Sequence, residues 1–284
     1  MYRLPVYSKF IAGNNLQSAI KVSNKLKNVK PIFDFSVETT TNKNRNVDEI
    51  FKQINTLDSS FIALKFSSLE MDNVKDSCDL IDQFYKENNK KTKPNRFLID
   101  AENYLIQNKI YEISDYAIDS YNTKREKHFY KTLQMYRNDV IKVYNDDINK
   151  FMKTNKYALK LVRGAYISTD KKYDIITKTK YYTDFQYNNS IDIFCEKLQN
   201  YPNNDLIIAT HNPDSYNIGI KNIKKSPEIN KNIFFATLLG MGDSICYDNT
   251  YYNKLKYIPY GPFFETTPYL FRRLVENIDI IKHI

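Results

Sequence analysis

A single (β/α)8 barrel is the fold that this sequence predicts, and three observations predict it. Short apolar runs alternate with longer helical segments, a pattern typical of a parallel sheet covered by helices. Eight such repeats occur in 284 residues, which is the size of a closed barrel. Polar residues stand at the ends of the runs, and the active site of such a barrel lies at the carboxyl ends of its strands. A doubly wound open sheet is the alternative, but no G-x-G-x-x-G follows the first run.

The predicted strands are the apolar runs, and helical segments lie between them. The runs occupy residues 32–38, 61–66, 97–102, 128–135, 158–165, 206–212, 233–239 and 257–260. Polar residues in the fourth run would suit a helix equally well. Helical periodicity occurs, for example, over residues 47–57, 76–85, 138–153, 184–198 and 213–221. An amphipathic helix over residues 15–29 belongs to a helical lead-in of about residues 1–30. No domain boundary stands out, so we expect residues 1–284 to form one barrel domain.

The last predicted element is a helix of about residues 266–278, which follows the eighth strand. Pro268 suits a first helical turn, and Thr266 or Thr267 is available as the N-cap. Helical spacing puts four polar side chains on one face: Tyr269, Arg272, Arg273 and Glu276. The same spacing predicts a packing stripe of Phe271, Leu274, Val275 and Ile278. Adjacent arginines repel each other unless an anion lies between them, and an arginine pair is a natural clamp for a carboxylate.

The composition is that of an ordinary globular protein, with 42% hydrophobic and 26% charged residues. The net charge is +9, but the lysines are spread along the chain, which disfavours nucleic-acid binding; attraction to an anionic membrane surface is a comparable alternative. Cys78, Cys195 and Cys246 have no disulfide or metal spacing, which indicates buried thiols in a reducing compartment. No apolar run is long enough to span a membrane, and residues 1–10 are too short for a targeting peptide.

Polar residues stand at or just after the predicted strand ends, which a barrel brings to one mouth. They are Glu38, Lys65, Asp100, Glu102, Gln134, Arg163, His211, Asn212, Asp243 and the arginine pair of the last helix. A metal site is conceivable from His211, Asp100 and Glu102, but the chain has only 3 histidines and we expect no metal. An anionic cofactor and a small anionic substrate would suit the cations of this mouth, which are Lys65, Lys160, Arg163, Arg272 and Arg273.

Seven segments, in chain order, resemble the motifs of the proline dehydrogenase family. They are Asp34-Phe-Ser-Val-Glu38, Ile62-Ala-Leu-Lys65, Ile99-Asp-Ala-Glu102, Lys160-Leu-Val-Arg-Gly-Ala-Tyr166, Ala209-Thr-His-Asn212, Leu238-Leu-Gly-Met241 and Tyr257-Ile-Pro-Tyr-Gly-Pro262 continuing through Pro268-Tyr-Leu-Phe-Arg-Arg273 to Asn277. Phe10-Ile-Ala-Gly13 is similar to the entry segment of the eukaryotic, mitochondrial branch. The resemblance covers about residues 7–280. Each motif alone is weak, but the set in correct order is specific.

The resemblance implies a flavoenzyme whose barrel holds FAD without a Rossmann motif. Such an enzyme oxidises L-proline to Δ1-pyrroline-5-carboxylate by hydride transfer from proline Cδ to flavin N5, and it passes electrons to a quinone. The family's place is the matrix side of the mitochondrial inner membrane, with peripheral association. No side chain stands out as a dedicated base.

The resemblance also implies roles for residues on the substrate side. Arg272 and Arg273 would clamp the proline carboxylate, and Glu38 would pair with Arg272 as a gate. The others would shape the pocket or lie near the carboxylate and flavin: Lys65, Asp100, Tyr257 and Tyr269.

For FAD, the implied contacts are Gln134 and Lys160 near the isoalloxazine, Val162, Gly164 and Ala165 along one strand, Thr210, His211 and Asn212 beside the ribityl chain and phosphates, Lys180 at the pyrophosphate, and Glu276 on the cofactor side. The chain departs from the family at Thr237, where eukaryotic relatives often have Gln. It also stops at Ile284, whereas relatives continue with a further helix or tail on the adenine side. We therefore expect low flavin affinity, unless a partner or a longer chain completes the site.

Four alternatives stay open. A hydroxyproline dehydrogenase differs by one hydroxyl of substrate, which shifts discrimination only modestly. Another FAD barrel, such as methylenetetrahydrofolate reductase, is disfavoured because a folate site has no use for a tight carboxylate clamp. A flavin-less homologue is disfavoured by the retained Lys65 and Asp100, and a basic binding protein by the spread charge.

Overall fold

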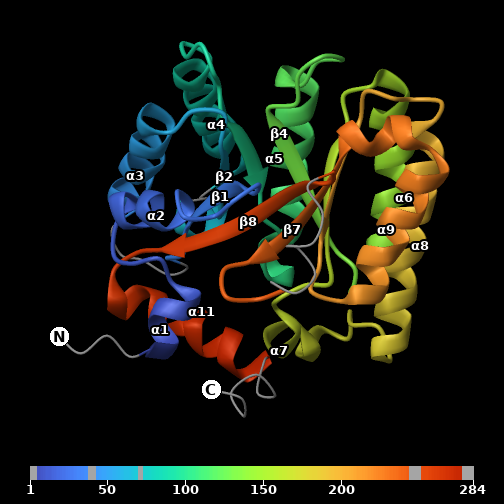
Figure 1. The fold of residues 1–284 in the computed structure, drawn as a ribbon. Coiled ribbons are helices and arrows are strands. Elements are labelled where there is room, and N and C mark those ends of the chain that lie inside the picture. The colour runs from blue at the N-terminus through green and yellow to red at the C-terminus, as the bar shows by residue number, and fades with distance from the viewer. Residues whose placement is uncertain (1–4, 38–42, 70–72, 243–250, 277–284) are drawn as a thin grey trace.

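The computed structural model describes residues 5–37, 43–69, 73–242 and 251–276, and these form a closed barrel of eight parallel strands (Figure 1). Each strand pairs with the next one in the chain, and β8 pairs with β1 to close the barrel. The strands are β1 (Lys30–Phe35), β2 (Phe61–Leu64), β3 (Arg96–Ile99), β4 (Phe129–Gln134), β5 (Ala158–Val162), β6 (Asp205–Ala209), β7 (Ile233–Leu238) and β8 (Asn253–Tyr260). The predicted fold is confirmed, and every predicted run contains a strand, including the fourth.

Helices surround the barrel and also precede and follow it. They are α1 (Pro5–Phe10), α2 (Leu16–Ser23), α3 (Lys43–Thr56), α4 (Val74–Asn88), α5 (Tyr104–Tyr121), α6 (Val140–Phe151), α7 (Ile167–Asp170), α8 (Lys180–Leu198), α9 (Pro213–Lys225) and α11 (Phe263–Glu276). Four of them begin after an asparagine whose side chain accepts a backbone N–H of the first turn: Asn15, Asn73, Asn103 and Asn212. Local capping of this kind fixes where a helix starts.

The core has two layers, because alternate residues of each strand point to opposite sides of the sheet. In β2, Phe61 and Ala63 face the barrel interior, whereas Ile62 and Leu64 pack against the surrounding helices. Toward the carboxyl ends of β6 and β7, the inner layer contains small residues, Ala209 and Ala236. These alanines leave room for a cavity at the carboxyl ends of the strands.

Helix α11 begins earlier than the sequence predicts, and this corrects the cap assignment. It starts at Phe263, so Pro268 lies inside the helix and neither threonine is an N-cap. Thr267 Oγ1 instead donates to the Phe263 carbonyl at 2.8 Å, and Thr266 Oγ1 donates to the Pro262 carbonyl at 3.1 Å. Both side chains therefore donate to carbonyls of the preceding turn, as threonine commonly does within a helix. The predicted packing stripe is also wrong at Phe271, which is 65% exposed.

Two other features bear on the predictions from sequence. Cys195 is buried and Cys78 is half-buried, both as free thiols, whereas Cys246 and Asp243 lie outside the described residues. Among the described helices, none combines the length and apolar character needed to cross a membrane.

Candidate active site

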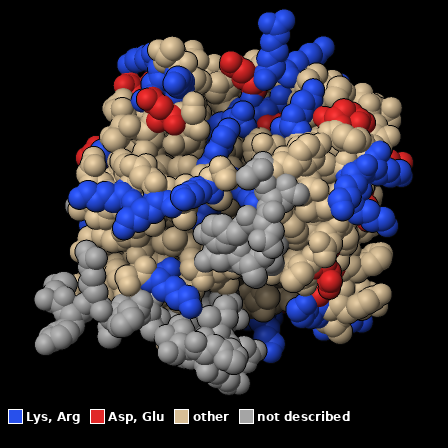
Figure 2. All heavy atoms as spheres, in the orientation of Figure 1, with Lys and Arg blue, Asp and Glu red and all other residues tan. Residues whose placement is uncertain are grey.

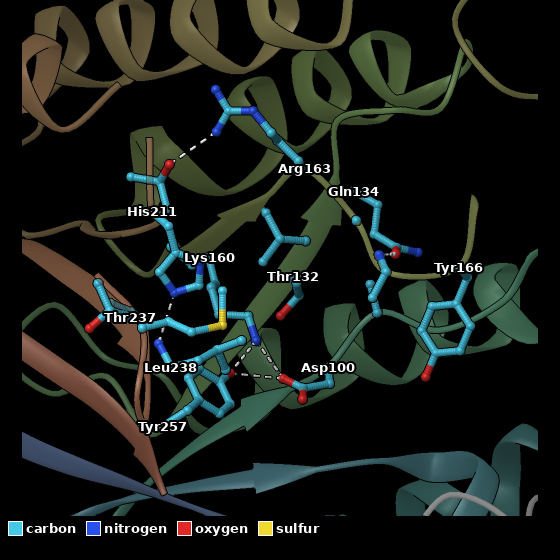
Figure 3. A pocket seen from close by; sticks show the side chains of 18 of the residues that line it. Asp100, Thr132, Gln134, Lys160, Arg163, Tyr166, His211, Thr237, Leu238 and Tyr257 are labelled. Atoms are coloured by element: carbon cyan, nitrogen blue, oxygen red, sulfur yellow. Dashed lines mark hydrogen bonds and ion pairs between the residues drawn. The ribbon is translucent and has the colours of Figure 1, made fainter. Parts of the chain in front are cut away.

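A cavity of about 550 Å³ opens at the carboxyl ends of the strands, within the size range of small-molecule sites (Figure 3). Every predicted site residue whose side chain is described lines it: Lys65, Asp100, Gln134, Lys160, Val162, Gly164, Ala165, Lys180, Thr210, His211, Asn212, Tyr257 and Tyr269. Residues from six strands or the segments just after them thus meet in one place because parallel strands of a barrel share one mouth.

Three of these residues form a hydrogen-bonded cluster at one side of the cavity. Asp100 follows β3, Lys160 lies in β5 and Tyr257 lies in β8. The Lys160 ammonium donates to Asp100 Oδ1 and to the Tyr257 hydroxyl, and that hydroxyl donates to Asp100 Oδ1 at 3.1 Å. Figure 3 shows the three side chains converging below the cavity. The cluster ties three separate strands together at the mouth.

Burial and mutual charge decide the protonation of this cluster. Burial disfavours ionisation of Asp100, but Lys160 and then Lys65 outweigh it, so the pKa of the carboxyl lies below its usual value. Burial lowers the pKa of Lys160, and the Asp100 carboxylate only partly offsets that effect. Burial, followed by the Asp100 charge, raises the pKa of the Tyr257 hydroxyl well above its usual value. The cluster is therefore an ion pair capped by a neutral phenol.

Lys65 belongs to a second ion pair, with Asp34 of β1. Its ammonium binds Asp34 Oδ1, and it lies 3.5 Å from Asp100 Oδ2. Asp34 is 2% exposed and also accepts a hydrogen bond of 2.9 Å from Ser36 Oγ. Asp34 lines the cavity and escaped the prediction from sequence, although it opens one of the quoted motifs. The two carboxylates hold the Lys65 ammonium at the mouth.

The Gln134 side chain connects two strand ends. Its Nε2 donates to the Glu102 carbonyl at 2.7 Å, and its Oε1 accepts from the Ala165 N–H at 3.2 Å. Glu102, which the sequence predicts at the same mouth, is not among the residues that line the cavity, and its Oε1 accepts from the Ser67 N–H at 2.9 Å. Burial raises the pKa of Glu102 to about 7, against the opposing hydrogen bond from Ser67. Gln134 thus fixes the loop after β5, whose backbone borders the cavity.

That loop depends on Gly164. Its φ is +123°, and a Cβ there would lie 2.0 Å from the ring of Tyr136. Only glycine accommodates both the conformation and the close approach. At Gly164 the loop therefore presents only backbone to the cavity.

The Thr-His-Asn segment after β6 is held by its neighbours. The Leu238 N–H donates to His211 Nε2 at 3.0 Å, so this nitrogen is unprotonated. Asn212 Oδ1 caps α9 by accepting from Asp214 and Ser215. Its side-chain oxygen therefore has a structural role, which the prediction of a cofactor contact did not include.

Arg163 also has a structural role. Its guanidinium donates to Asp184 Oδ1 at 2.6 Å, Thr210 Oγ1 at 3.0 Å and Ser215 Oγ at 2.8 Å, and it covers the Tyr187 ring. Asp184 also pairs with Lys180, whose side chain is 76% exposed at the edge of the cavity. Arg163 therefore anchors the segment after β6 to α8 and α9, and Lys180 is the more open cation.

Helix α11 brings Tyr269, 6% exposed, to the cavity wall. The helix is tied to α3 by the Arg45–Glu265 ion pair, in which Arg45 Nη1 lies 2.9 Å from Glu265 Oε1. It is tied to α1 by a hydrogen bond of 3.2 Å between Tyr7 and Thr266. Figure 1 shows α1 and α11 side by side near the strand ends. The predicted Arg272, Arg273 and Glu276 lie on α11, but their side chains are outside the described part, as is all of Glu38.

The cavity has features that fit a flavin-like group. Thr132 Oγ1, which no sequence motif marks, is buried at the cavity wall and has no hydrogen-bond partner among the described residues. The lining combines apolar residues with polar side chains: Val162, Ala209, Ala236 and Leu238 with Lys160, Gln134 and Lys180. A flat, partly polar ring with an anionic tail would meet matching groups here. No cluster of potential metal ligands occurs in the described part of the chain.

Comparisons with known proteins agree on one family. The family described as proline dehydrogenase matches residues 14–283. The chain is 32% identical over 231 residues to proline dehydrogenase 1, mitochondrial, of Dictyostelium discoideum, covering 76% of this chain and 40% of that protein. It is 31% identical over 209 residues to the Drosophila melanogaster protein of the same name, covering 66% of this chain and 30% of that one. The chain thus spans less than half the length of these relatives.

Among solved structures, proline utilization A of Bdellovibrio bacteriovorus, inactivated by N-propargylglycine, has a similar fold. The TM-score is 0.81 at 17% sequence identity, over 96% of this chain and 32% of that one. This likeness supports the barrel fold independently of the sequence matches.

Proposed function

Because the chain belongs to the proline dehydrogenase family, we propose that it oxidises L-proline to Δ1-pyrroline-5-carboxylate with FAD as its cofactor. The observation that carries this proposal is the single cavity in which the motif residues meet, with the Asp100–Lys160–Tyr257 cluster on one side and Tyr269 of α11 in its wall. Bound FAD would accept the hydride that leaves proline Cδ. The remaining work of binding and orientation falls to side chains of this chain.

The cofactor would lie against the loop after β5 and the segment after β6. Gln134, Lys160, Val162, Gly164 and Ala165 would border its ring system, as the sequence resemblance implies. The ribityl and phosphate side would be lined by Thr210, His211 and Asn212, with Lys180 and Glu276 as further contacts. The neutral His211 and the exposed Lys180 suit this polar half of the ligand.

Proline would be held between the cluster and α11. Arg272 and Arg273 would bind its carboxylate, because a guanidinium pair matches a planar carboxylate in both geometry and charge. Tyr257 and Tyr269 would pack against the pyrrolidine ring, and Lys65 would add a positive charge nearby. Glu38 would pair with Arg272 over the bound substrate. Asp100 fixes Lys160 and Tyr257 in place and so orders the pocket.

The positive charge of Lys65 and Lys160 would stabilise negative charge that develops on a reduced cofactor. Each ammonium is already paired with a carboxylate, so each is fixed in position before a ligand arrives. Such preorganised charge costs no rearrangement during the reaction. No side chain is assigned as a general base.

The electrons would pass to a quinone, and the protein would act at the matrix side of the mitochondrial inner membrane with peripheral membrane association. Relatives of this chain carry the word mitochondrial in their names, which supports the compartment. No metal and no nucleic acid are part of the proposal.

A steady-state assay of the FAD-reconstituted chain tests the proposal. L-Proline with a soluble quinone should give Δ1-pyrroline-5-carboxylate, detected as its o-aminobenzaldehyde adduct. trans-4-Hydroxy-L-proline and 5-methyltetrahydrofolate, each of which would donate electrons through the flavin to the quinone, serve as the competing substrates. Faster turnover of either competitor than of proline would reject the proposed substrate.

A further inference from the structure

A second cavity, of about 190 Å³, lies at the opposite end of the barrel from the candidate active site. It is built where strands begin: Lys30 opens β1, Arg96 opens β3, and Lys127 and His128 directly precede β4. Because the strands are parallel, these starts meet at the amino-terminal end. Figure 2 shows lysine and arginine side chains gathered in the upper middle of one face, over the region of α5 and β4 in Figure 1.

The cavity has a strong excess of positive charge. Lys30, Arg96, Arg125 and Lys127 line it, and Glu126 is the acidic residue among the lining groups. Neither Lys30 nor Lys127 forms an ion pair with a described residue, although Lys127 is only 6% exposed. Burial lowers the pKa of both lysines, and the Arg96 guanidinium lowers it further, while Asp205 opposes this at Lys127. The cations therefore repel one another across the cavity.

The donors of this cluster are only partly used. Lys127 Nζ donates to the carbonyls of Thr123 at 2.8 Å and Lys124 at 3.4 Å, which leaves one proton of the ammonium. Arg96 Nη1 donates to the Tyr130 hydroxyl at 3.1 Å and lies 3.8 Å from Asp205 Oδ2, which offsets part of the positive charge, and the guanidinium packs over the rings of Phe61 and Phe234. The packing on the two aromatic rings and the hydrogen bond to Tyr130 fix the orientation of the Arg96 guanidinium. The site is thus held by the fold and is not a loose group of surface charges.

We propose that this cavity binds a small phosphate group, either the free ion or a small monoester, held by Lys30, Arg96 and Lys127. An anion of two charges would relieve the repulsion among three cations, which a single carboxylate would do less well. Lysine ammoniums and an arginine fork are the usual donors to phosphate oxygens. The volume admits a phosphate with a few carbon atoms and excludes a dinucleotide.

Glu126 distinguishes phosphate from sulfate. Its Oε2 lies 3.4 Å from His128 Nε2, and burial lowers the pKa of this histidine, so the imidazole is neutral near pH 7. A carboxylate at the cavity can accept a hydrogen bond from the hydroxyl of HPO₄²⁻, the free ion, but it only repels sulfate or the dianion of a monoester, neither of which carries a proton on its anionic group at that pH. Phosphate should therefore bind more tightly than sulfate.

Isothermal titration calorimetry of the full, FAD-reconstituted chain with inorganic phosphate tests the proposal, in a phosphate-free buffer at constant ionic strength. Lys30→Gln and Lys127→Gln should each weaken phosphate binding roughly tenfold, as expected for the loss of a hydrogen bond to a charged group. Lys224→Gln on the exposed face of α9 removes the same charge elsewhere and should change nothing. Lys30 is exposed, so its variant is expected to fold even if the Lys127 variant does not.

The outcomes separate a built site from general charge attraction. Tighter binding of glycerol 3-phosphate than of phosphate would identify a monoester as the ligand, and the reverse would identify the free ion. Three results would mean an adventitious ion only and overturn the proposal. They are a titration with phosphate that shows no saturable heat of binding, an affinity for sulfate equal to that for phosphate, and a Lys224→Gln variant that weakens phosphate binding as much as the cavity variants do. Proline turnover of the Lys30 variant should be unchanged, which keeps this test independent of the active site.

Discussion

A single carboxylate oxygen, Asp100 Oδ1, accepts hydrogen bonds from both the Lys160 ammonium and the Tyr257 hydroxyl. The phenol lies 3.1 Å from that oxygen, and it also accepts a hydrogen bond from Lys160. The three groups therefore form a closed triangle between β3, β5 and β8. One ion pair thus fixes both the charge and the shape of this side of the cavity.

The two polar partners of Lys160 should differ strongly in their effect on stability. Asp100→Asn leaves a buried ammonium without a carboxylate, and we expect the free energy of unfolding to fall by about 3–5 kcal/mol. Tyr257→Phe removes hydrogen bonds but no charge, so we expect a loss of about 1–2 kcal/mol. Urea unfolding of the apoprotein measures both. Equal losses for the two variants would show that the ion pair does not stabilise this site.

The proposed carboxylate clamp predicts a specific loss of substrate affinity. Arg272→Met should raise the apparent KM for proline roughly a hundredfold, because a hydrogen-bonded charge contact contributes about 3 kcal/mol. Flavin content, read from the visible absorbance, should be unchanged. Lys224→Met removes a positive charge from α9 and serves as the control. An unchanged KM in the Arg272 variant would reject the clamp.

The unpartnered hydroxyl of Thr132 predicts opposite effects on stability and on cofactor binding. Thr132→Val keeps the side-chain shape, so apoprotein stability should be unchanged or slightly higher. Flavin affinity should fall about tenfold if the hydroxyl bonds to the cofactor. Thr183→Val is the matched control, because that buried hydroxyl already bonds to Thr177 at 2.6 Å. It should lower stability and leave flavin affinity unchanged; the same pattern for Thr132 would contradict the prediction.

Glu102 predicts a pH-dependent stability. Its pKa is about 7 in the folded protein and near 4.5 in the unfolded chain, so the folded state binds the proton more tightly between these values. The contribution of Glu102 to the free energy of unfolding is fully present below pH 4.5, and it is lost as the pH rises to 7. Glu102→Gln should remove that loss and make the protein more stable than the parent at pH 8, by up to about 3 kcal/mol. Denaturant titrations at pH 5 and pH 8 measure it.

A control on the same helix region separates this effect from a general change of charge. Glu112→Gln alters an exposed carboxylate of α5 and should leave the pH profile of stability as it is in the parent. A parent profile that rises between pH 5 and pH 8, or a Glu102 variant with the parent's profile, would contradict the assignment.

The fold could be predicted because its signals are local. Apolar runs mark each strand, and asparagine caps mark several helix starts, so neither depends on distant contacts. The motif residues also come together predictably, since a parallel barrel collects all its strand ends at one mouth. The roles of these residues could not be predicted in the same way. Asn212 caps α9, and Arg163 donates hydrogen bonds to side chains of α8 and α9, so both roles depend on neighbouring helices.

What the sequence did not reveal is pairing between distant residues. Asp34 holds Lys65 because β1 and β2 pair with Ile32 opposite Phe61, and this register is not visible in either segment alone. Thr132 is distinguished only by its lack of a partner, which requires the surrounding atoms. The start of α11 differs from the expected one because a proline usually lies in the first turn of a helix, whereas Pro268 lies in the interior of α11.

The most direct test of the proposed function is a single anaerobic mixing experiment. The FAD-reconstituted chain is mixed with L-proline in the absence of oxygen and of any electron acceptor, and the visible absorbance of the oxidised flavin is followed. Loss of that absorbance on addition of L-proline, but not of D-proline, is the predicted result. A protein that binds FAD and whose absorbance is indifferent to L-proline would contradict the account.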